Sequence, residues 1–339
     1  MTTVLLTHGP SALANYYGER ALTGLRAVAT VRLNPNEEAW TTATLAQAAQ
    51  GCDIVVSYRL AGADAALFER LPELVAWCRC AVDIRNIDVG AASVRGILVT
   101  RASPGFVASV AEWVLGALVD LSRGISDAVL DYRSGRVPAA HMGRELRGAT
   151  LGIVGYGLIG RRVAEIGVAL GMRVLVSDPH ARATDPALQQ VGLAALLAQS
   201  DHVVCLAVAN AATENLFDAA AFAAMRPGAC FVNASRGNLV DEAALLGALD
   251  SGHLFGCALD VGREADQMPS LALARHPRVV ATPHNGGLTP QAIEHQALET
   301  VAQVAEIVQG RIPAGAVNAA HASRFAAFAA RPRAAHGAD

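Results

Sequence analysis

The sequence predicts an α/β protein with two parallel sheets, each covered by helices on both faces. Short apolar runs alternate with helix-like segments through the first hundred residues and again after residue 150, and this alternation is typical of parallel sheets. A glycine-rich turn follows the apolar run at 151–154, in the middle of the chain. The length of 339 residues exceeds that of most single domains, which favours two domains.

The first hundred residues form one complete alternating unit. Its apolar runs predict buried strands, and the segments between them have helical spacing. A long apolar helix is expected after this unit, over 104–123. The expected strands cover 4–7, 28–33, 54–58, 74–80 and 96–100, and the expected helices cover 12–25, 44–50 and 61–71.

The turn at 155–160 has the glycine spacing of a dinucleotide-binding Rossmann unit. Gly155 permits a sharp turn, Gly157 lets the backbone approach a pyrophosphate, and Gly160 lets the next helix pack close to the strand. Leu158 and Ile159 lie in the first turn of that helix, whose unpaired N–H groups can bind phosphate oxygens. Strand, glycine turn and helix in this order predict a dinucleotide site.

An acidic residue ends the next expected strand, at 173–177. Asp178 lies eighteen residues after Gly160, where a carboxylate can accept hydrogen bonds from the ribose diol of the adenosine. This position favours NAD as the cofactor. Arg182 leaves NADP open, because a nearby arginine can pair with a 2′-phosphate.

Further strands complete the second sheet, and the chain then returns to the first. The amphipathic segment 290–309 follows the last strand, so we expect it to pack on the N-terminal domain and make that domain discontinuous. The predicted domains are 1–101 with 288–318, and 102–287, before a tail at 319–339 that is mobile or one short helix. The later strands, six in all for this sheet, are expected at 202–207, 229–233, 256–259 and 279–281, and the helices at 193–199, 219–225 and 242–249.

The composition argues against several classes of function. With 17% charged residues and a net charge of −3, the chain has no basic surface for nucleic acid or anionic membranes. The most apolar segment, 110–121, is too short to span a membrane and carries two acidic residues. We expect a cytoplasmic protein without a targeting signal. No metal site is expected, because the six cysteines lie mostly in apolar runs without zinc spacing.

Arg236 and His284 each follow an expected strand of the second sheet. Ligands of open α/β sheets bind outside the carboxyl ends of the strands, so both side chains are placed to meet one. A guanidinium can grip a carboxylate and polarise a neighbouring carbonyl, and an imidazole titrates near neutrality, as a proton donor must. We therefore expect Arg236 to hold a substrate and His284 to protonate it, with a surface arginine as the alternative interpretation of Arg236.

Neighbouring residues in these loops have predicted roles in holding the cofactor and His284. Asp260 can accept a hydrogen bond from the nicotinamide amide, and Glu264 can orient His284 and stabilise its imidazolium form. A solvated loop acid is the alternative interpretation of Glu264. The predicted cofactor contacts in these loops are Ala234, Ser235, Arg236, Asp260, His284, Gly286 and Gly287.

Seven separated stretches of the chain follow one family pattern: 86–88, 96–100, 109–112, 155–160, 233–237, 259–261 and 282–284. In these stretches the chain resembles the D-isomer-specific 2-hydroxyacid dehydrogenase family. The resemblance implies a Rossmann NAD-binding domain inserted into a flavodoxin-like substrate domain, a homodimer formed through the long helix after Thr100, and an active site in the interdomain cleft with hinges near 101 and 287. It also implies Arg236, Glu264 and His284 as catalytic residues and a substrate-carboxylate loop of Ala81, Val82 and Asp83.

Two departures from the family pattern concern the substrate and the partner of His284. The family's acid usually stands where this chain has Ala265 and is followed by proline, so Glu264 is the preferred partner and Asp266 the second choice. The family's substrate loop is usually glycine-rich and ends in Asp-Asn, whereas this chain has Asp83 in the loop and Arg85 before Asn86. Asp83 brings a carboxylate to an anion site unless it turns away or pairs with Arg85.

The resemblance implies an NAD-dependent oxidoreductase that interconverts a small 2-keto acid, such as one like glyoxylate or hydroxypyruvate, and its D-2-hydroxy acid. Arg236 would bind the carboxylate and polarise the carbonyl, His284 would protonate its oxygen, and Glu264 would hold His284 charged. Two alternatives stay open. One is the same fold acting on a formate-like or phosphite-like anion, and the other is a catalytically weak protein that senses NAD(H) by binding it.

Overall fold

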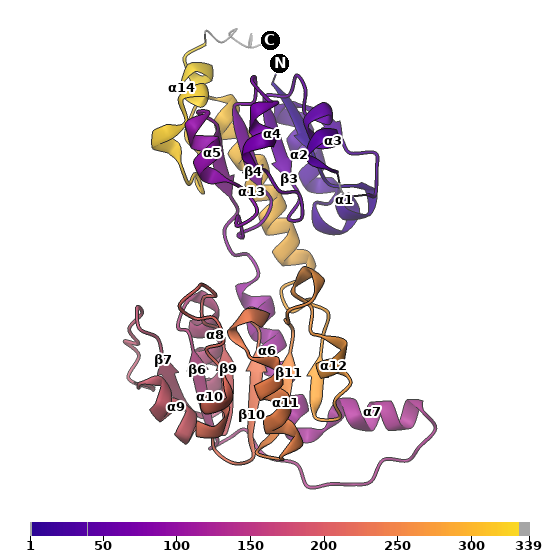
Figure 1. The fold of residues 1–339 in the computed structure, drawn as a ribbon, viewed down its shortest axis with the longest axis vertical. Coiled ribbons are helices and arrows are strands. Elements are labelled where there is room, and N and C mark those ends of the chain that lie inside the picture. The colour runs from indigo at the N-terminus through magenta and orange to yellow at the C-terminus, as the bar shows by residue number, and fades with distance from the viewer. Residues whose placement is uncertain (1, 39, 332–339) are drawn as a thin grey trace. The chain divides into compact units, whose positions relative to one another are not determined.

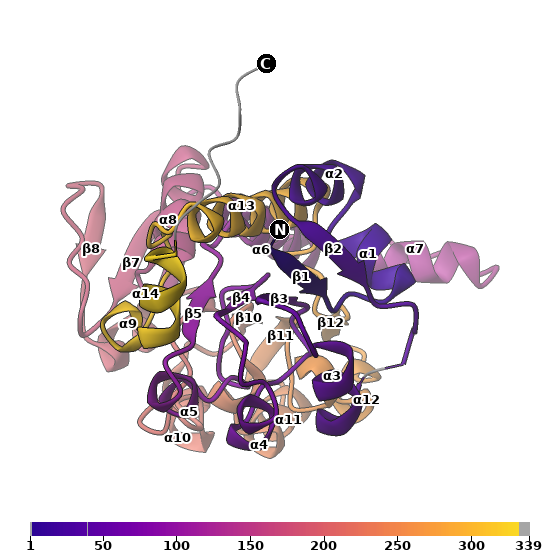
Figure 2. The ribbon, with the colours of Figure 1, turned by 90° about the horizontal axis from the view of Figure 1, so that it is seen from above.

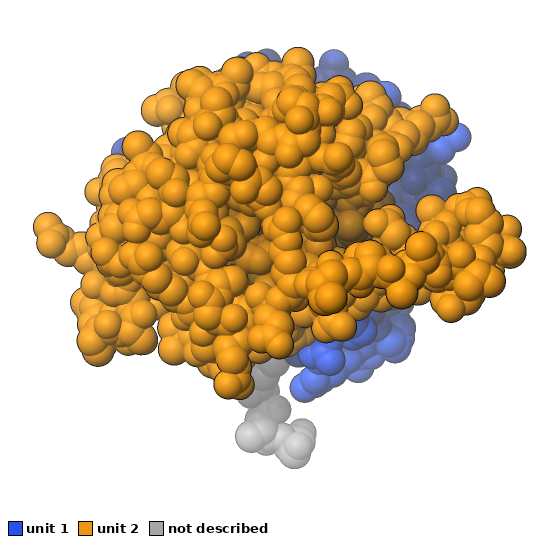
Figure 3. Space-filling view, turned by 90° about the horizontal axis from the view of Figure 1, so that it is seen from below, with its two compact units in different colours: residues 1–105, 290–339 blue, residues 106–289 orange. Residues whose placement is uncertain are grey.

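The computed structural model describes residues 2–38 and 40–331, which belong to two compact units. Unit 1 comprises Met1–Gly105 and Pro290–Asp339, and unit 2 comprises Phe106–Thr289, as coloured in Figure 3. The chain leaves unit 1 and re-enters it a few residues beyond the breaks expected at 101 and 287.

Unit 1 is built on a five-stranded parallel sheet with the strand order β2-β1-β3-β4-β5. This order is that of the flavodoxin-like fold, which confirms the predicted class. Every neighbouring pair of these strands runs parallel. The strands are β1 (Thr3–Leu6), β2 (Thr30–Leu33), β3 (Ile54–Ser57), β4 (Ala76–Arg79) and β5 (Leu98–Arg101).

Helices cover both faces of this sheet, as Figure 2 shows. On β3, Ile54 and Val56 pack in one core with α2, α13 and α14, while Val55 packs in a second core with α3, α4 and α5. Alternate strand residues point to opposite faces, so a strand buried on both faces needs the continuous apolar run that the sequence has here. The helices are α1 (Pro10–Tyr16), α2 (Glu19–Val28), α3 (Thr42–Ala48), α4 (Ala65–Glu69), α5 (Val89–Val94), α13 (Pro290–Val308) and α14 (Ser323–Ala329).

The helices of unit 1 differ from expectation in two places. The single helix expected over 12–25 is two helices, because Gly18 between them has a φ of 82°, which a continuous helix cannot contain. Helix α5 was not predicted from its short, alanine-rich sequence. In the C-terminal tail, of the two expected alternatives the short helix is the one observed: α14 buries Phe325 in the core of unit 1, while 332–339 lie outside the described residues.

Unit 2 is built on a seven-stranded parallel sheet with the order β12-β11-β10-β9-β6-β7-β8. The order confirms the doubly wound Rossmann class, and the sheet has one strand more than the six predicted. The additional edge strand β8 has the sequence Leu-Gln-Gln, which carries no apolar run. The strands are β6 (Thr150–Val154), β7 (Arg173–Ser177), β8 (Leu188–Gln190), β9 (His202–Cys205), β10 (Ala229–Asn233), β11 (Leu254–Leu259) and β12 (Val279–Ala281).

Two layers of helices enclose the sheet of unit 2. Helices α6 and α8 pack on one face, and α9, α10 and α11 pack on the other (Figure 1). No helix in the described part of the chain is long and apolar enough to cross a bilayer. The helices are α6 (Val107–Arg123), α7 (Ile125–Arg133), α8 (Leu158–Ala169), α9 (Leu193–Gln199), α10 (Ala219–Ala224), α11 (Glu242–Asp250) and α12 (Leu271–Ala274).

Candidate functional site

The glycine turn joins β6 to α8 at the carboxyl edge of the sheet of unit 2. Gly155 has a φ of 99°, and a side chain there would come within 2.5 Å of the Leu206 backbone. A Cβ on Gly160 would lie 2.2 Å from the Gly155 carbonyl oxygen, so the helix packs against the turn too closely for any other residue. Around Gly157, in contrast, the space is open for 4 Å. The turn is therefore tight on its protein side and open where a ligand would approach.

This turn fits the diphosphate of a dinucleotide. No side chain caps the N-terminus of α8, so the N–H groups of Leu158, Ile159 and Gly160 point past Gly157 toward the open space. The dipole of this twelve-residue helix also favours a negative group at that end. The residues present can thus hold the cofactor that the sequence predicts.

Asp178 follows β7 and closes the glycine turn from the side. Its carboxylate accepts hydrogen bonds from the N–H groups of Tyr156 at 2.7 Å, His180 at 2.7 Å and Ala181 at 2.8 Å. Partial burial acts to raise the pKa of this carboxyl, but these N–H groups and the nearby His180 hold the pKa below its usual value. Asp178 is therefore a fixed anion, and its oxygens keep lone pairs for a ribose diol.

Asp260 clamps the loop that carries His284. Its carboxylate is buried at the end of β11 and accepts hydrogen bonds from Thr282 Oγ1 at 2.6 Å and from the N–H groups of Asn285 and Gly286, each at 2.9 Å. A Cβ on Gly286 would come within 2.7 Å of Asp260 Oδ2. Asp260 thus fixes the backbone on both sides of His284, a structural role in addition to the predicted contact with nicotinamide.

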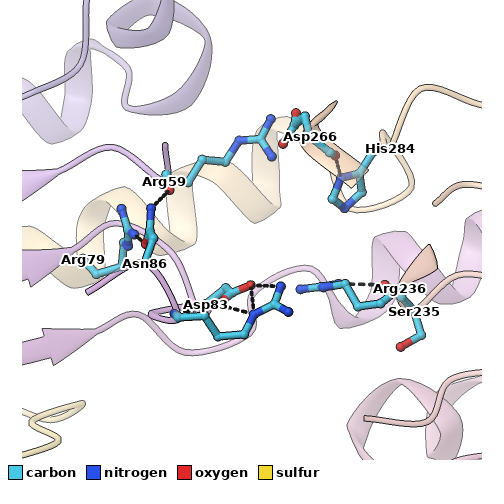
Figure 4. A network of polar contacts seen from close by, with 9 residues as sticks. Arg59, Arg79, Asp83, Asn86, Ser235, Arg236, Asp266 and His284 are labelled. Atoms are coloured by element: carbon cyan, nitrogen blue, oxygen red, sulfur yellow. Dashed lines mark hydrogen bonds and ion pairs between the residues drawn. The ribbon is translucent and has the colours of Figure 1, made fainter. Parts of the chain in front are cut away.

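The imidazole of His284 is hydrogen-bonded to a main-chain carbonyl. Its Nδ1 lies 2.6 Å from the carbonyl oxygen of Asp266, as Figure 4 shows. The backbone is unusual on both sides of this contact, because the φ angles of Asp266, Gln267 and His284 are 54°, 61° and 53°. Such values are uncommon for residues other than glycine and tend to occur at functional sites. The loop geometry is what brings the carbonyl to the ring.

The predicted pairing of Glu264 with His284 is not present in this structure. Glu264 is exposed, and no ion pair joins His284 to a carboxylate within the described part of unit 2. The turn from Glu264 to Met268 directs the Asp266 carbonyl toward the imidazole, and its own backbone hydrogen bonds fix it. In this structure the partner of His284 is thus a main-chain carbonyl two residues further along the chain, and the role of Glu264 in holding His284 charged stays a prediction.

Arg236 lies on the loop after β10. In the sheet, β10 is next to β11, and β11 is next to β12. Its NH1 group donates to the carbonyl of Ser235 at 2.7 Å, and the Asn233 side chain donates to the Arg236 carbonyl at 3.0 Å. Ser235 Oγ donates to the carbonyl of Ala207 at 2.6 Å and ties this loop to the segment after β9. Carboxyl ends of neighbouring parallel strands share one edge, so Arg236, Asp260 and His284 lie at the same edge of unit 2 as the glycine turn.

The predicted substrate loop follows β4 in unit 1. Asp83 in this loop forms a local ion pair with Arg85: Arg85 NH2 lies 2.7 Å from Oδ2, and Nε lies 3.0 Å and 3.1 Å from the two oxygens. The backbone N–H of Arg85 also donates to Asp83. Of the two orientations left open by the sequence, the pairing with Arg85 is the one observed.

Two buried basic residues of unit 1 were missed from the sequence. Arg79 ends β4 and His8 follows β1, and both side chains are completely buried. The signal for Arg79 was available, because an arginine inside the apolar run 74–80 is out of place in a buried strand. His8 lies between the rings of Tyr17 and Tyr58, with centroids 5.1 Å away in each case.

Comparison with known proteins agrees with this fold and these motifs. Residues 115–286 match the family described as D-isomer specific 2-hydroxyacid dehydrogenase, NAD binding domain. The match covers half of the chain and most of unit 2, including the glycine turn, Asp178, Arg236 and His284. The protein belongs to this family.

Individual relatives support the same assignment. The chain is 39% identical over 246 residues to an (S)-sulfolactate dehydrogenase of Chromohalobacter salexigens, covering 71% of this chain and 80% of that one. It is 36% identical to a D-3-phosphoglycerate dehydrogenase of Mycobacterium tuberculosis, over 75% of this chain but only 49% of the relative. Among solved structures, the TT0316 protein from Thermus thermophilus has a TM-score of 0.84 at 30% identity, over 93% of this chain and 100% of that one.

Family membership fixes the class of enzyme and the cofactor. The chain is an NAD-dependent oxidoreductase of the 2-hydroxyacid dehydrogenase family, as the sequence predicted. The glycine turn, the start of α8 and Asp178 are the parts of unit 2 that fit NAD(H). The relatives act on different 2-hydroxy acids, so their names do not select a substrate for this chain.

Proposed function

We propose that this protein interconverts a small 2-keto acid and its D-2-hydroxy acid with NAD(H). The observation that carries the proposal is the placement of Arg236 and His284 on loops at the carboxyl edge of the sheet that also carries the glycine turn. A reaction at a carbonyl next to a carboxylate needs a cation and a proton donor beside the nicotinamide, and these two residues supply both.

In the direction of reduction, each of these residues has a defined task. The Arg236 guanidinium grips the carboxylate of the keto acid and polarises its C2 carbonyl. Protonated His284 gives its Nε2 proton to the carbonyl oxygen as that oxygen gains charge. Bound NADH supplies the hydride to C2. In the direction of oxidation, neutral His284 removes the hydroxyl proton.

The hydrogen bond to Asp266 leaves Nε2 of His284 as the reacting nitrogen. A carbonyl oxygen can only accept, so Nδ1 carries a proton in both charge states of the ring. Nε2 is then a donor in the imidazolium and an acceptor in the neutral imidazole. The loop thereby selects the tautomer that proton transfer requires, a task that a carboxylate performs in other histidine sites.

A panel of acids tests the proposal and separates the candidate substrates. Glyoxylate, hydroxypyruvate and pyruvate are offered with NADH, and 3-sulfolactate, D-3-phosphoglycerate, formate and phosphite with NAD, each followed by the nicotinamide absorbance. Turnover of one or more 2-keto or 2-hydroxy acids supports the proposal. Turnover of formate or phosphite alone would overturn it in favour of a different anion.

A protein that binds NAD(H) without catalysis is the second candidate. One observation favours it: His284 has no carboxylate partner in the described part of its own unit, so the support that a catalytic imidazolium usually receives is weaker. Tight NADH binding, measured by nicotinamide fluorescence, with no turnover on the whole panel is the result that this candidate predicts.

We also infer a homodimer, formed through α6 and α7, in the cytoplasm. Helix α7 extends away from the sheet of unit 2 (Figure 1) and exposes Leu130, Tyr132 and Ile125 by 63%, 65% and 49%. The groove between α6 and α7 has a volume of about 440 Å³ and is lined mainly by apolar side chains. Exposed apolar surface of this kind marks an interaction site. The six free, buried cysteines suit a reducing compartment.

A single charge introduced on α7, in the proposed dimer interface, tests the self-association. Leu130→Asp should convert the dimer to a monomer in analytical ultracentrifugation, because the interface would have to bury a carboxylate. Val94→Asp places the same charge on an 88% exposed residue of unit 1 and should leave the dimer intact. A wild-type protein that sediments as a monomer would contradict the inference.

A further inference from the structure

Arg79 carries a positive charge in the interior of unit 1, where Asp83 acts on that charge without forming an ion pair with it. It is the last residue of β4 and the only buried arginine in the described part of the chain. No carboxylate within 2–38 and 40–331 forms an ion pair with it. Burying an unpaired charge is costly, so such a group is retained where an anion compensates it or where the charge has a use.

The hydrogen bonds of Arg79 are all made to neutral groups. NH1 donates to the carbonyl oxygens of Tyr58 at 2.5 Å and Ala61 at 3.0 Å, and NH2 donates to Oδ1 of Asn86 (Figure 4). The Nε atom is buried without a partner. Dipoles therefore hold the guanidinium in place, but they leave its net charge uncompensated.

The charged and titratable groups around Arg79 do not cancel this field. Burial lowers the pKa of Arg79 to about 10, and Asp83 opposes that shift, so the guanidinium is charged at neutral pH. Burial, together with the charge of Arg79, lowers the pKa of His8 to about 3, so this neighbour is neutral. The carboxylate of Asp83 is already engaged by Arg85.

The position of Arg79 connects this charge to the predicted substrate loop. Ala81, Val82 and Asp83 begin two residues after Arg79, and Ala102 donates its N–H both to the Arg79 carbonyl and to the Ala81 carbonyl. Through Tyr58, Ala61 and Asn86, the guanidinium also joins the segments that follow β3 and β4. The charge of Arg79 thus lies at the carboxyl edge of this sheet, just before the 81–83 loop.

We propose that Arg79 is a positioning residue whose buried, uncompensated charge makes the 81–83 loop of unit 1 an anion site, with the substrate carboxylate as the missing counter-charge. The inference rests on the proposed function, because it assigns that carboxylate to this loop. Arg79 acts through its field and through the loop it holds, and the backbone N–H groups of the loop make the contact. Substrates without a carboxylate should gain nothing from it.

Asn86→Asp tests the electrostatic effect of the Arg79 charge and keeps an oxygen that can accept the hydrogen bond from Arg79. The substitution places a carboxylate at the atom that already bonds Arg79, so it supplies the counter-charge internally. The KM for the 2-keto acid should rise about tenfold or more, with kcat and the thermal midpoint close to wild type. The matched control Asn36→Asp adds the same charge to an exposed loop after the edge strand β2 and should change neither constant.

Arg79→Gln and Arg79→Lys separate charge from bonding. Arg79→Lys keeps the charge but loses the forked donors, so it should lower the thermal midpoint and keep KM within about threefold of wild type. Arg79→Gln removes the charge, so it should raise KM as Asn86→Asp does. An unchanged KM in both Asn86→Asp and Arg79→Gln overturns the inference. If Arg79→Gln fails to fold, Asn86→Asp decides alone.

Binding of oxalate keeps this test independent of turnover. Oxalate resembles a 2-keto acid but cannot be reduced, and its Kd for the NADH-saturated protein is measured by isothermal titration calorimetry. Oxalate should bind wild type about tenfold more tightly than Asn86→Asp. If wild type binds oxalate about tenfold more tightly than Asn86→Asp but reduces no acid, the proposed function fails and the role of Arg79 stands. Equal affinities in an active enzyme contradict the role of Arg79 alone.

Discussion

The two units share an architecture but differ in where they place the arginine that is proposed to act on the substrate. Unit 2 carries Arg236 and His284 on loops, outside the sheet, and holds them with backbone groups. Unit 1 carries Arg79 inside, at the end of the buried strand β4, with the neutral His8 also buried after β1. A charged group on a loop can react and be replaced at little cost to folding, whereas a buried one ties function to stability. Substitutions in the two units should therefore have different signatures.

Loss of His284 should give the largest effect on catalysis. His284→Gln removes the proton donor, so kcat should fall by about 10²- to 10⁴-fold. Because the ring lies on a loop and Asp260 holds that loop independently, the thermal midpoint and the Kd for NADH should stay close to wild type. Steady-state kinetics measure kcat, thermal denaturation measures the midpoint, and a fluorescence titration measures the Kd for NADH. Normal turnover of this variant would show that another group donates the proton.

Arg236→Gln should act mainly on substrate binding. Removing the cation that grips the carboxylate should raise KM for the keto acid by about 10- to 100-fold, since charged hydrogen bonds contribute about 1.5–3 kcal/mol. The matched control is Asn238→Ala, two residues further along the chain, which removes the hydrogen bond that its side chain donates to Glu214. A large fall in the thermal midpoint of Arg236→Gln would mean that this arginine is structural, like Arg79.

The stability of unit 1 should depend on pH through His8. Burial, then the charge of Arg79, lowers the pKa of His8 to about 3 in the folded protein, while the unfolded chain titrates near 6.5. Between these values the unfolded state binds more protons, so the free energy of unfolding falls as the pH falls, by at most about 1.4 kcal/mol per pH unit.

Comparison with a variant isolates this contribution. His8→Phe keeps a ring between Tyr17 and Tyr58 but cannot be protonated, so its stability relative to wild type should improve steadily from about pH 6.5 to about pH 4 in urea titrations. His202 in unit 2, whose pKa burial lowers to about 4, contributes the same trend in both proteins and cancels. Parallel pH profiles for the two proteins would contradict the assignment of a neutral, buried His8.

The sequence predicted unit 2 better than unit 1 for physical reasons. A glycine turn needs particular residues at fixed spacing, so Gly155, Gly157 and Gly160 could be located before the fold was known. Burial of Arg79 depends on strands β3 and β4 lying side by side, which links Ser57, Tyr58 and Asn86 around one guanidinium. Contacts between segments far apart in sequence leave no local pattern. A lone arginine in an apolar run was the only trace.

The hydrogen bond between His284 and Asp266 could not be predicted for a related reason. Sequence spacing proposes acidic side chains, because their identity is visible, and it cannot propose a main-chain carbonyl, which every residue has. The carbonyl of Asp266 reaches the ring only because Asp266 and Gln267 adopt positive φ angles. Nothing in the residues 264–267 marks that conformation in advance.

Glu264→Gln should give the smallest effect and distinguish the two accounts of His284. Glu264 is exposed, and the imidazole is already held by Asp266. The kcat should therefore stay within about twofold of wild type, as for most surface substitutions, and the pH optimum should not move. Asp266→Asn keeps the carbonyl and tolerates a positive φ, so it should preserve the orientation of the ring as well. A shift of the pH optimum in Glu264→Gln alone would mean that the loop rearranges on ligand binding to bring this carboxylate to the imidazole. Unit 2 would then hold its imidazole with a side-chain acid on a mobile loop. It would differ from unit 1, with its buried Arg79, in mobility as well as in exposure.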